Sequence, residues 1–403
     1  MTGDTPTTQR IQSIDAFRGF ALAGIAIAHM VEQYYGAMPP PGLLDDIAAS
    51  GLDKAAGAFM EIFVRGKFFA LFSFLFGVSF FIQMDNGARK GINFRARFLW
   101  RLALLFLIGY AHALFYRGDI LTIYAVVGVG LVLFFRVRSA ACLVLAALVL
   151  LGLPRFLLFA LNGGDVLFPS GAADPSLPAN VAYTEAVTQG GLADVFRANA
   201  WHGLVTKAEY QLNVFGRGYL TFAYFLIGLC VGRLGLFRDL EQQAGLLKRV
   251  LWIALAAGIL TFVTAGFLFS TLPENSGLDN WQAMFALTAM DLWNLSFATL
   301  YLCGFLLWFN RSRGQRILGK LAPYGRTALS NYVLQTLIGT TLLYNFGFGM
   351  LGRLSNADMF AIAIAVIAGQ VMLSAVWLRH FRFGPLEWLW RSGTRLEWQR
   401  LRR

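Results

Sequence analysis

Three ionisable residues stand within or beside the first long apolar run, residues 10–35 (RIQSIDAFRGFALAGIAIAHMVEQYY). Asp15 and Arg18 are three residues apart, so on a helix they share a face and can form an ion pair. His29 follows Asp15 by 14 residues, which is about 21 Å along a helix and roughly two-thirds of a hydrocarbon core. An imidazole at that depth should face protein or water. A neutral histidine there is a candidate general base.

The second apolar run carries charges at its beginning. Glu61 and Arg65 are four residues apart and can pair on a helix. Lys67 follows them and lies deeper in the run. One interpretation is that these side chains snorkel to the membrane interface. The other is that Lys67 lies too deep for this and has a functional partner.

The third and fourth runs form a predicted hairpin whose turn reads Tyr-Arg-Gly-Asp. His112 lies close to the exterior end of the third run, and Arg117 and Asp119 lie in the turn. The turn is interpreted as a surface ion pair of little energetic value, and His112 as an interface histidine bonded to a carbonyl. The alternative is that His112 shares the depth of His29 and takes part in its chemistry.

The ninth run is unusually polar for an apolar segment. Arg326, Ser330, Asn331 and Gln335 fall on one broad face of a continuous helix over 322–345. These residues either hydrogen-bond to neighbouring helices or form part of a site in which Arg326 binds a phosphate. Asp291 and Asn294, in the eighth run, are interpreted as cap residues at its exterior end.

Composition places the chain in a membrane. Of 403 residues, 57% are hydrophobic and 14% are charged, against about 25% charged in a typical soluble protein. The mean hydropathy is +0.58. We therefore predict an all-α polytopic membrane protein. The net charge of +12 comes from clusters at the ends of apolar runs, which favours lipid headgroups over nucleic acid as partners. The three cysteines lie inside apolar runs and have no metal-binding spacing, so no metal is expected.

About ten apolar runs are long enough to span a bilayer. They lie near 16–36, 57–84, 98–116, 119–136, 139–161, 213–236, 249–271, 286–309, 322–345 and 359–379. Basic connectors alternate with acidic or weakly charged ones, which predicts one bundle with both termini cytoplasmic. Residues 1–403 form a single transmembrane domain, 162–212 a long exterior connector, and 380–403 a basic aromatic cytoplasmic tail. In this tail Pro385 should start an interfacial helix.

Several stretches together resemble a bacterial inner-membrane family, the YeiB-like proteins. They are SIDAFRGFALAGI, RGKFFALFSFLFGVSF, RLALLFLIGYAHALFYRGDILTIYAVVG, GRTALSNYVLQTLIGT and HFRFGPLEWLWRSGT. The first stretch is similar to a transmembrane acyltransferase superfamily that includes heparan-α-glucosaminide N-acetyltransferase. The superfamily opening S-x-D-x-x-R-G falls on Ser13, Asp15, Arg18 and Gly19, and its first-span Asn or His falls on His29. YeiB-like relatives are usually Asn-like there.

The resemblance implies a multi-pass protein of the bacterial inner membrane that takes an acyl donor from the cytoplasm and an acceptor from the exterior. In such a reaction His29 would be the base, and Asn331 or Ser330 would stabilise the oxyanion. Arg18 and Arg326 would bind the phosphates of an acyl-CoA co-substrate, with no covalently bound cofactor. The other candidate substrate- or donor-binding residues are Asp15, Glu61, Arg65, Lys67, His112, Arg117 and Asp119.

Two other functions remain open. A transporter of a small or lipidic solute could use His29, Lys67 and Glu61 as a proton relay. A membrane scaffold or sensor would need these polar residues only to hold its helices together. Membrane lipids are the expected partners, and glycine faces on the helices allow a homodimer.

Overall fold

The chain is all-helical in a computed structural model that describes residues 6–91, 93–161, 174–237, 240–273, 278 and 280–403. The described residues also contain one isolated antiparallel β-bridge, between Phe381 and Arg402. The helices of the first half are α1 Pro6–Val31, η1 Asp45–Ala48, α2 Gly51–Phe59, η2 Met60–Val64, α3 Lys67–Arg89, α4 Arg95–Phe115, α5 Leu121–Phe134, α6 Ser139–Leu150, α7 Leu153–Leu161, α8 Pro178–Thr188 and α9 Leu192–Ala200. Those of the second half are α10 His202–Leu212, α11 Arg217–Leu234, α12 Leu240–Ser270, α13 Trp281–Phe309, α14 Ser312–Leu318, η3 Gly319–Leu321, α15 Ala322–Arg326, α16 Ala328–Leu343, α17 Asn356–His380 and α18 Pro385–Arg395.

This is a multi-pass membrane protein. Within the described residues, 6 helical segments are long and apolar enough to cross a bilayer, and there are up to 8 if each bent pair is one span. The bent pairs are α6 with α7, at 54°, and α10 with α11, at 65°. Each of the ten predicted runs is at least partly helical, but α5 has only 14 residues and α16 only 16.

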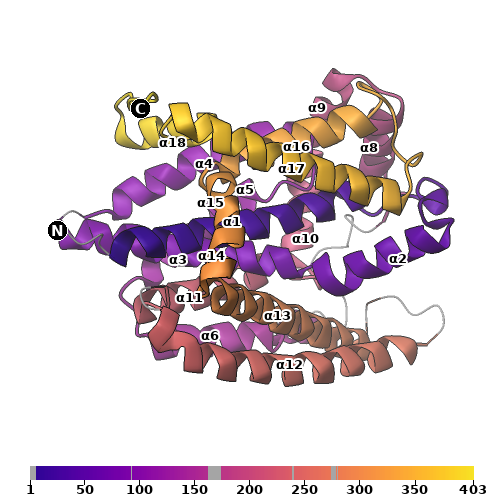
Figure 1. The fold of residues 1–403 in the computed structure, drawn as a ribbon. Coiled ribbons are helices and arrows are strands. Elements are labelled where there is room, and N and C mark those ends of the chain that lie inside the picture. Colours follow the sequence, from indigo (N-terminus) through magenta and orange to yellow (C-terminus); the bar gives the residue numbers. More distant parts are fainter. Residues whose placement is uncertain (1–5, 92, 162–173, 238–239, 274–277, 279) are drawn as a thin grey trace.

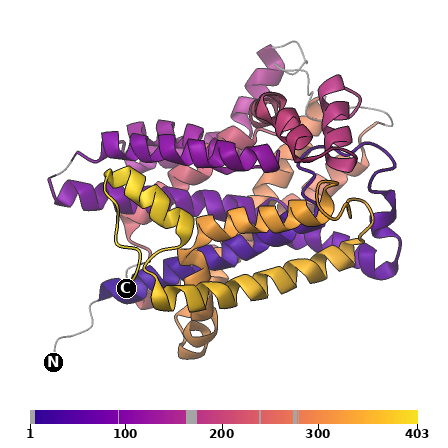
Figure 2. The same cartoon turned by 90° about the horizontal axis from the view of Figure 1, so that it is seen from above.

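Helix α1 lies at the centre of the bundle and packs against α3, α15, α16 and α17. Its beginning and the C-terminus of the chain lie at the same end of the bundle (Figures 1 and 2). Helices α12 and α13 form a separate layer along one side (Figure 1). The outermost helix, α12, exposes large apolar side chains such as Trp252, Leu260 and Phe267, as a lipid-facing helix does. We call the two ends of the bundle the Arg18 end, where α1 starts, and the His29 end, where it stops.

The first predicted run ends earlier than expected. Helix α1 stops at Val31 because Gln33 and Tyr34 adopt positive φ angles of 52° and 50°, which a right-handed helix cannot contain. His29 therefore lies in the last turn of α1, nearer to the helix end than the predicted run 16–36 implies.

The ninth predicted run is not one helix. It breaks at Thr327, whose ψ of 32° separates α15 from α16, so Arg326 does not continue the face of Ser330 and Asn331. The cap prediction for the eighth run was also wrong. Helix α13 is capped by Asn280 and starts at Trp281, which leaves Asp291 and Asn294 buried inside the helix.

Both ends of the bundle are covered by short helices. Residues 174–212 of the predicted connector fold as α8, α9 and α10 at the His29 end, where Tyr35 and Thr184 hydrogen-bond at 2.6 Å; residues 162–173 lie outside the described part. At the Arg18 end, α18 starts at Pro385 as predicted. It packs against α4, where the Trp390 indole donates to the Arg101 carbonyl at 2.9 Å.

Candidate functional site

A buried histidine and aspartate lie at the centre of the site. The turn after α4 brings Asp119 back to His112, and the His112 Nδ1 atom lies 2.8 Å from Asp119 Oδ1. On the other side of the ring, Nε2 lies 2.8 Å from the Thr336 hydroxyl on α16. Since an ionised carboxylate can only accept a hydrogen bond, the Nδ1 atom carries the proton. In this tautomer the Nε2 atom accepts a hydrogen bond from the Thr336 hydroxyl. The three side chains form an aspartate–histidine–hydroxyl chain.

Asp119 is fully buried and its charge is compensated. Its Oδ2 atom accepts hydrogen bonds from the backbone N–H and hydroxyl of Thr122, at 2.9 and 2.7 Å. The Lys207 ammonium, on α10, lies 3.4 Å from the same oxygen. Burial alone would raise the pKa of the Asp119 carboxyl, but Lys207 and His112 hold it well below its usual range. Asp119 is therefore ionised at physiological pH and holds His112 in one orientation.

His29 lies beside this chain in a ring of tyrosines. Its imidazole meets the rings of Tyr34, Tyr116 and Tyr332 edge-on, with centroid distances of 5.4, 5.1 and 6.0 Å. His29 also lies within electrostatic range of His112 and Asp119. Its Nδ1 atom is buried and has no hydrogen-bond partner among the described residues. A buried polar atom without a partner is unusual, and it leaves His29 with a free position for a ligand or proton.

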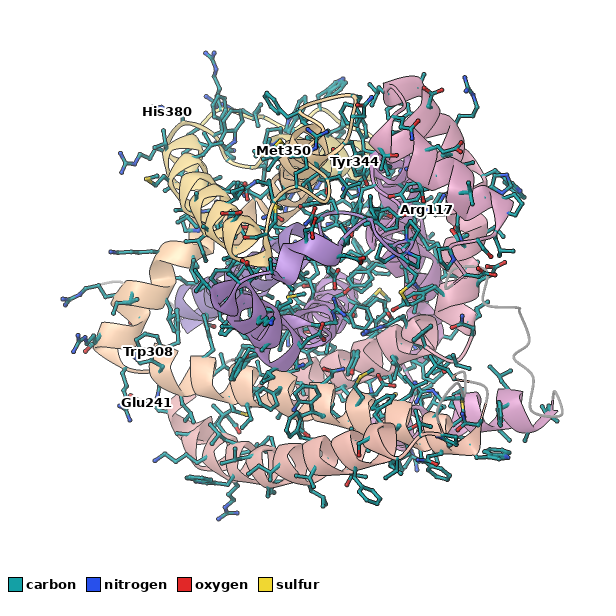
Figure 3. All side chains as sticks on the ribbon, turned by 90° about the vertical axis from the view of Figure 1, so that its right-hand side faces the viewer. Arg117, Glu241, Trp308, Tyr344, Met350 and His380 are labelled. Carbon is teal, nitrogen blue, oxygen red and sulfur yellow. The ribbon has the colours of Figure 1, made fainter. Side chains whose placement is uncertain are left out.

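Arg117 is not part of a surface ion pair, as the turn was interpreted, because it is only 4% exposed. Its guanidinium donates to Asn180 at 2.9 Å and to Asn199 at 3.3 Å, and it lies 3.7 Å from the ring centroid of Tyr183. Figure 3 shows Arg117 and Tyr344 near one another at the His29 end, and both contact Tyr183. Arg117 thus ties α8 and α9 to the hairpin.

The charged residues at the start of α3 and in the turn before it divide into two groups. Arg65 pairs with Glu61 at 2.8 Å, as the spacing predicted, and also with Glu32 at 3.1 Å. Glu61 lies in η2, a π-helical turn. Lys67 is only 1% exposed, so the snorkelling interpretation does not apply to it. Its ammonium donates to the Glu61 backbone carbonyl at 2.7 Å and lies 3.6 Å from the centroid of the Trp293 ring.

At the Arg18 end, the predicted Asp15–Arg18 ion pair is present at 2.8 Å. Arg18 also donates to Ser79 at 3.3 Å. Arg326 lies within electrostatic range of Asp15, and Arg101 within range of Arg18 and Arg391. Arg101 stacks on α18, with its guanidinium 3.5 Å from the Trp390 ring centroid. Two guanidinium groups, those of Arg18 and Arg326, therefore lie near the Asp15 carboxylate, and Arg101 and Arg391 extend the cationic group beyond it, an arrangement suited to a phosphate-bearing ligand.

Ser330 and Asn331 bond to other helices and not to His29 or His112 in the described part of the chain. The Ser330 hydroxyl donates to Glu387 of α18, which also accepts from the Leu329 N–H at 2.6 Å. Burial raises the pKa of the Glu387 carboxyl, and these bonds from Ser330 oppose the rise. The Asn331 amide donates to Thr327 at 2.8 Å and to Ser374 at 2.9 Å. These contacts match the first of the two interpretations of the ninth run, in which its polar residues hydrogen-bond to neighbouring helices.

The structure brings together His29, His112 and Asp119, and separately Asp15, Arg18 and Arg326. Sequence reasoning missed Thr336, Lys207 and the tyrosines around His29. It also missed Arg101 and Arg391. Thr336 lacks any charge to mark it among the other polar residues of its run, and Lys207 lies in the long connector, outside the apolar runs. In the described chain, no three His, Cys, Asp or Glu side chains lie where they could hold a metal ion.

Comparison with known proteins places the chain in a family. Residues 231–397 match the family model described as "Protein of unknown function (DUF418)". The protein is 30% identical to the uncharacterized protein YxaH of Bacillus subtilis, over 98% of this chain and 96% of that protein. It is 29% identical to the uncharacterized protein YeiB of Escherichia coli, over 96% of both. The chain therefore belongs to the DUF418 family of YeiB- and YxaH-like bacterial proteins.

Proposed function

We propose that this protein is a membrane-bound acyltransferase that moves an acyl group from a cytoplasmic acyl-CoA-type donor to an exterior or lipid acceptor. The single observation that carries the proposal is the buried Nδ1 atom of half-buried His29, which has no partner among the described residues and lies beside the Asp119–His112–Thr336 chain. Acyl transfer from a thioester needs a base for the acceptor. An imidazole whose Nδ1 atom has no partner can accept that proton.

The surroundings of His29 support its role as a base. Three tyrosine rings shield part of the half-buried imidazole, and such shielding disfavours its charged form before reaction. The ionised Asp119 lies within electrostatic range of His29 and would stabilise the positive charge that develops when the imidazole takes a proton.

The donor would bind at the Arg18 end. Arg18, Arg326, Arg101 and Arg391 supply guanidinium groups there, and guanidinium groups bind phosphates in a bidentate manner. The topology that goes with this assignment has about ten spans, with the short α5 and α16 included, and both termini cytoplasmic. The basic clusters at the Arg18 end agree with the positive-inside rule, and the relatives are bacterial, so we assign the protein to the inner membrane.

The test is an acyl-transfer assay in proteoliposomes. Purified protein is reconstituted with a total bacterial lipid extract and supplied with radiolabelled acetyl-CoA or longer acyl-CoA on the Arg18 side. We expect label to appear in an acceptor of the extract, and His29→Ala to abolish the transfer at equal folded protein. His202→Ala is the matched control, because His202 is exposed on α10.

Two results would contradict the proposal. One is the absence of labelled product above empty liposomes for every acyl-CoA tried. The other is transfer by His29→Ala at the rate of the unchanged protein, which would place the chemistry elsewhere.

Proton-coupled transport is a second candidate, and one observation favours it. His29, His112, Asp119 and Lys207 form a series of buried or half-buried ionisable groups through electrostatic or hydrogen-bonded contact. Such a series is a common feature of proton relays. A transporter would leave acyl-CoA intact and move protons across the liposome membrane, which a pH-sensitive dye trapped inside would report.

A further inference from the structure

Helices α3 and α11 run parallel and begin side by side. Gly77 of α3 lies against the backbone of Phe225, and Gly228 of α11 lies against the backbone of Phe74. Lys67 starts α3 ten residues before Gly77, and Arg217 starts α11 eleven residues before Gly228. The N-terminal ends of the two helices are therefore level with each other, and both lie at the His29 end of the bundle.

Both helices start in the same way, with a left-handed glycine followed by a cation. Gly66 before α3 has a φ of 80°, and Gly216 before α11 has a φ of 59°. Neither helix has a side-chain cap at its first turn. The first N–H groups of a helix and its dipole attract anions. Here two such ends point the same way, and each begins with a cationic residue.

Several buried donors near these ends have unused hydrogen-bonding capacity. Trp293, whose ring lies under the Lys67 ammonium, is 8% exposed, and its indole N–H has no partner among the described residues. The Asn213 amide, three residues before Gly216, is 3% exposed and likewise has an unpartnered Nδ2. Its oxygen is already used by the Phe215 N–H at 3.0 Å, which fixes the amide orientation.

One acceptor accompanies these donors. The Asn294 side chain lies directly against Gly66, and its Oδ1 atom is buried without a partner in the described part of the chain. A Cβ at residue 66 would collide with this amide, so glycine is required here by close approach as well as by its φ angle. A phosphate that carries a hydroxyl would satisfy both the donors and this acceptor.

The charges around the two helix ends do not balance. Arg155 binds Asp291 at 2.6 Å, and Arg65 binds both Glu32 and Glu61. Arg217 lies within electrostatic range of Asp291 and hydrogen-bonds to Tyr210, and Lys67 lies within electrostatic range of Glu61. Neither cation forms an ion pair within the described residues. Lys67 and Arg217 also lie within electrostatic range of each other. Lys67 is buried and Arg217 is half-buried, and like charges in such surroundings are costly unless a counter-ion compensates them.

We propose that the paired N-terminal ends of α3 and α11 form a binding site for a phosphate group. Lys67 and Arg217 would supply its counter-charges, and Trp293 and Asn213 its neutral donors. The phosphate can belong to a lipid headgroup at the His29 end or to free inorganic phosphate. Binding needs no acyl donor, so this inference stands or falls apart from the proposed acyl transfer.

The test measures the midpoint of thermal unfolding of the purified protein. One series adds sodium phosphate in detergent, against sodium chloride of equal ionic strength. A second series compares phosphatidylcholine nanodiscs with and without phosphatidylglycerol. We expect a saturable rise in the midpoint with phosphate, with phosphatidylglycerol or with both. Trp293→Phe keeps an aromatic ring but removes the indole N–H. It should weaken binding about tenfold, because one hydrogen bond to a charged group is lost.

Lys67→Met should remove the rise, and two variants serve as controls. Lys54→Met removes an exposed lysine of α2, and Trp252→Phe changes an exposed tryptophan of α12; both should respond as the unchanged protein does. A rise with phosphatidylglycerol alone identifies a lipid headgroup, and a rise with phosphate shows that the free ion enters. The proposal is overturned if neither additive raises the midpoint. It is also overturned if Trp293→Phe responds like Trp252→Phe, a comparison that holds even where Lys67→Met does not fold.

Discussion

The polar residues around His29 and those at the start of α16 look alike in sequence, but they differ in how fully their hydrogen bonds are made. The Asn331 amide donates to Thr327 and Ser374, and the Ser330 hydroxyl donates to Glu387. By contrast, the buried Nδ1 of His29 has no partner in the described chain. Because folded proteins satisfy nearly all buried polar groups, the two regions differ in purpose. Bonds at the start of α16 hold helices together, whereas the Nδ1 atom of His29 is left without such a bond in the described chain, which the proposed function assigns to the proton-accepting position.

The two regions also differ in charge. The His112 region contains the buried pair of Asp119 and Lys207, 3.4 Å apart. The start of α16 relies on neutral amides and hydroxyls, with Glu387 as its one carboxylate among the contacts described. A buried ionic group costs desolvation that neutral groups avoid. The desolvation cost of the Asp119–Lys207 pair is therefore consistent with a function that needs a fixed charge beside His112.

The largest loss of stability is expected for Asp119→Ala. Removing this carboxylate leaves His112, Thr122 and Lys207 without their shared acceptor. Breaking a buried pair on one side costs about 3–5 kcal/mol. Denaturant unfolding of the detergent-purified protein should show this loss, and the folded yield should fall with it.

The control for this variant is Asp46→Ala, since Asp46 is exposed and should change stability by less than about 0.5 kcal/mol. A loss of similar size in the two variants would mean that Asp119 is not the centre of its cluster.

A smaller loss is expected for Asn331→Leu, which keeps the branching at Cγ and removes the amide. The Ser374 and Thr327 hydroxyls lose a donor, at a cost of about 1–3 kcal/mol. If α16 bonding is structural, acyl transfer or transport should fall only with the folded fraction. Activity lost at full folded yield would instead give Asn331 the oxyanion role that the sequence suggested.

Sequence reasoning reached as far as local spacing and composition allow. It predicted the multi-pass helical class, the Asp15–Arg18 and Glu61–Arg65 pairs and the start of α18 at Pro385, all of which depend on neighbours along the chain. It could not predict the bond between His112 and Thr336, which are 224 residues apart, because apolar periodicity does not say which helices are adjacent. For the same reason it treated Arg117 as exposed, although α8 and α9 cover it.

Arg18→Gln should have a modest effect on stability. The Asp15–Arg18 pair is partly exposed, with side-chain exposures of 14% and 26%, and such pairs contribute about 0.2–1 kcal/mol. The proposed function adds a second expectation, a raised KM for acyl-CoA with little change in kcat, because Arg18 would contact the donor and not the reacting atoms. Arg89→Gln is the control, since Arg89 forms an exposed pair with Asp85 at 3.0 Å. An unchanged KM for Arg18→Gln would remove Arg18 from the donor site.

The smallest effect on stability, and the sharpest test of the contrast between the two regions, is expected for His29→Gln. Glutamine is polar and of similar length but cannot act as a base near neutral pH. Since Nδ1 makes no hydrogen bond to the described residues, no bond is lost, and the change in unfolding free energy should stay within about 1 kcal/mol, below the cost of a broken buried pair. Acyl transfer should nevertheless disappear. The opposite pattern, a loss above about 2 kcal/mol with activity following the folded fraction, would make His29 a structural residue like Asn331 and erase the difference between the two regions.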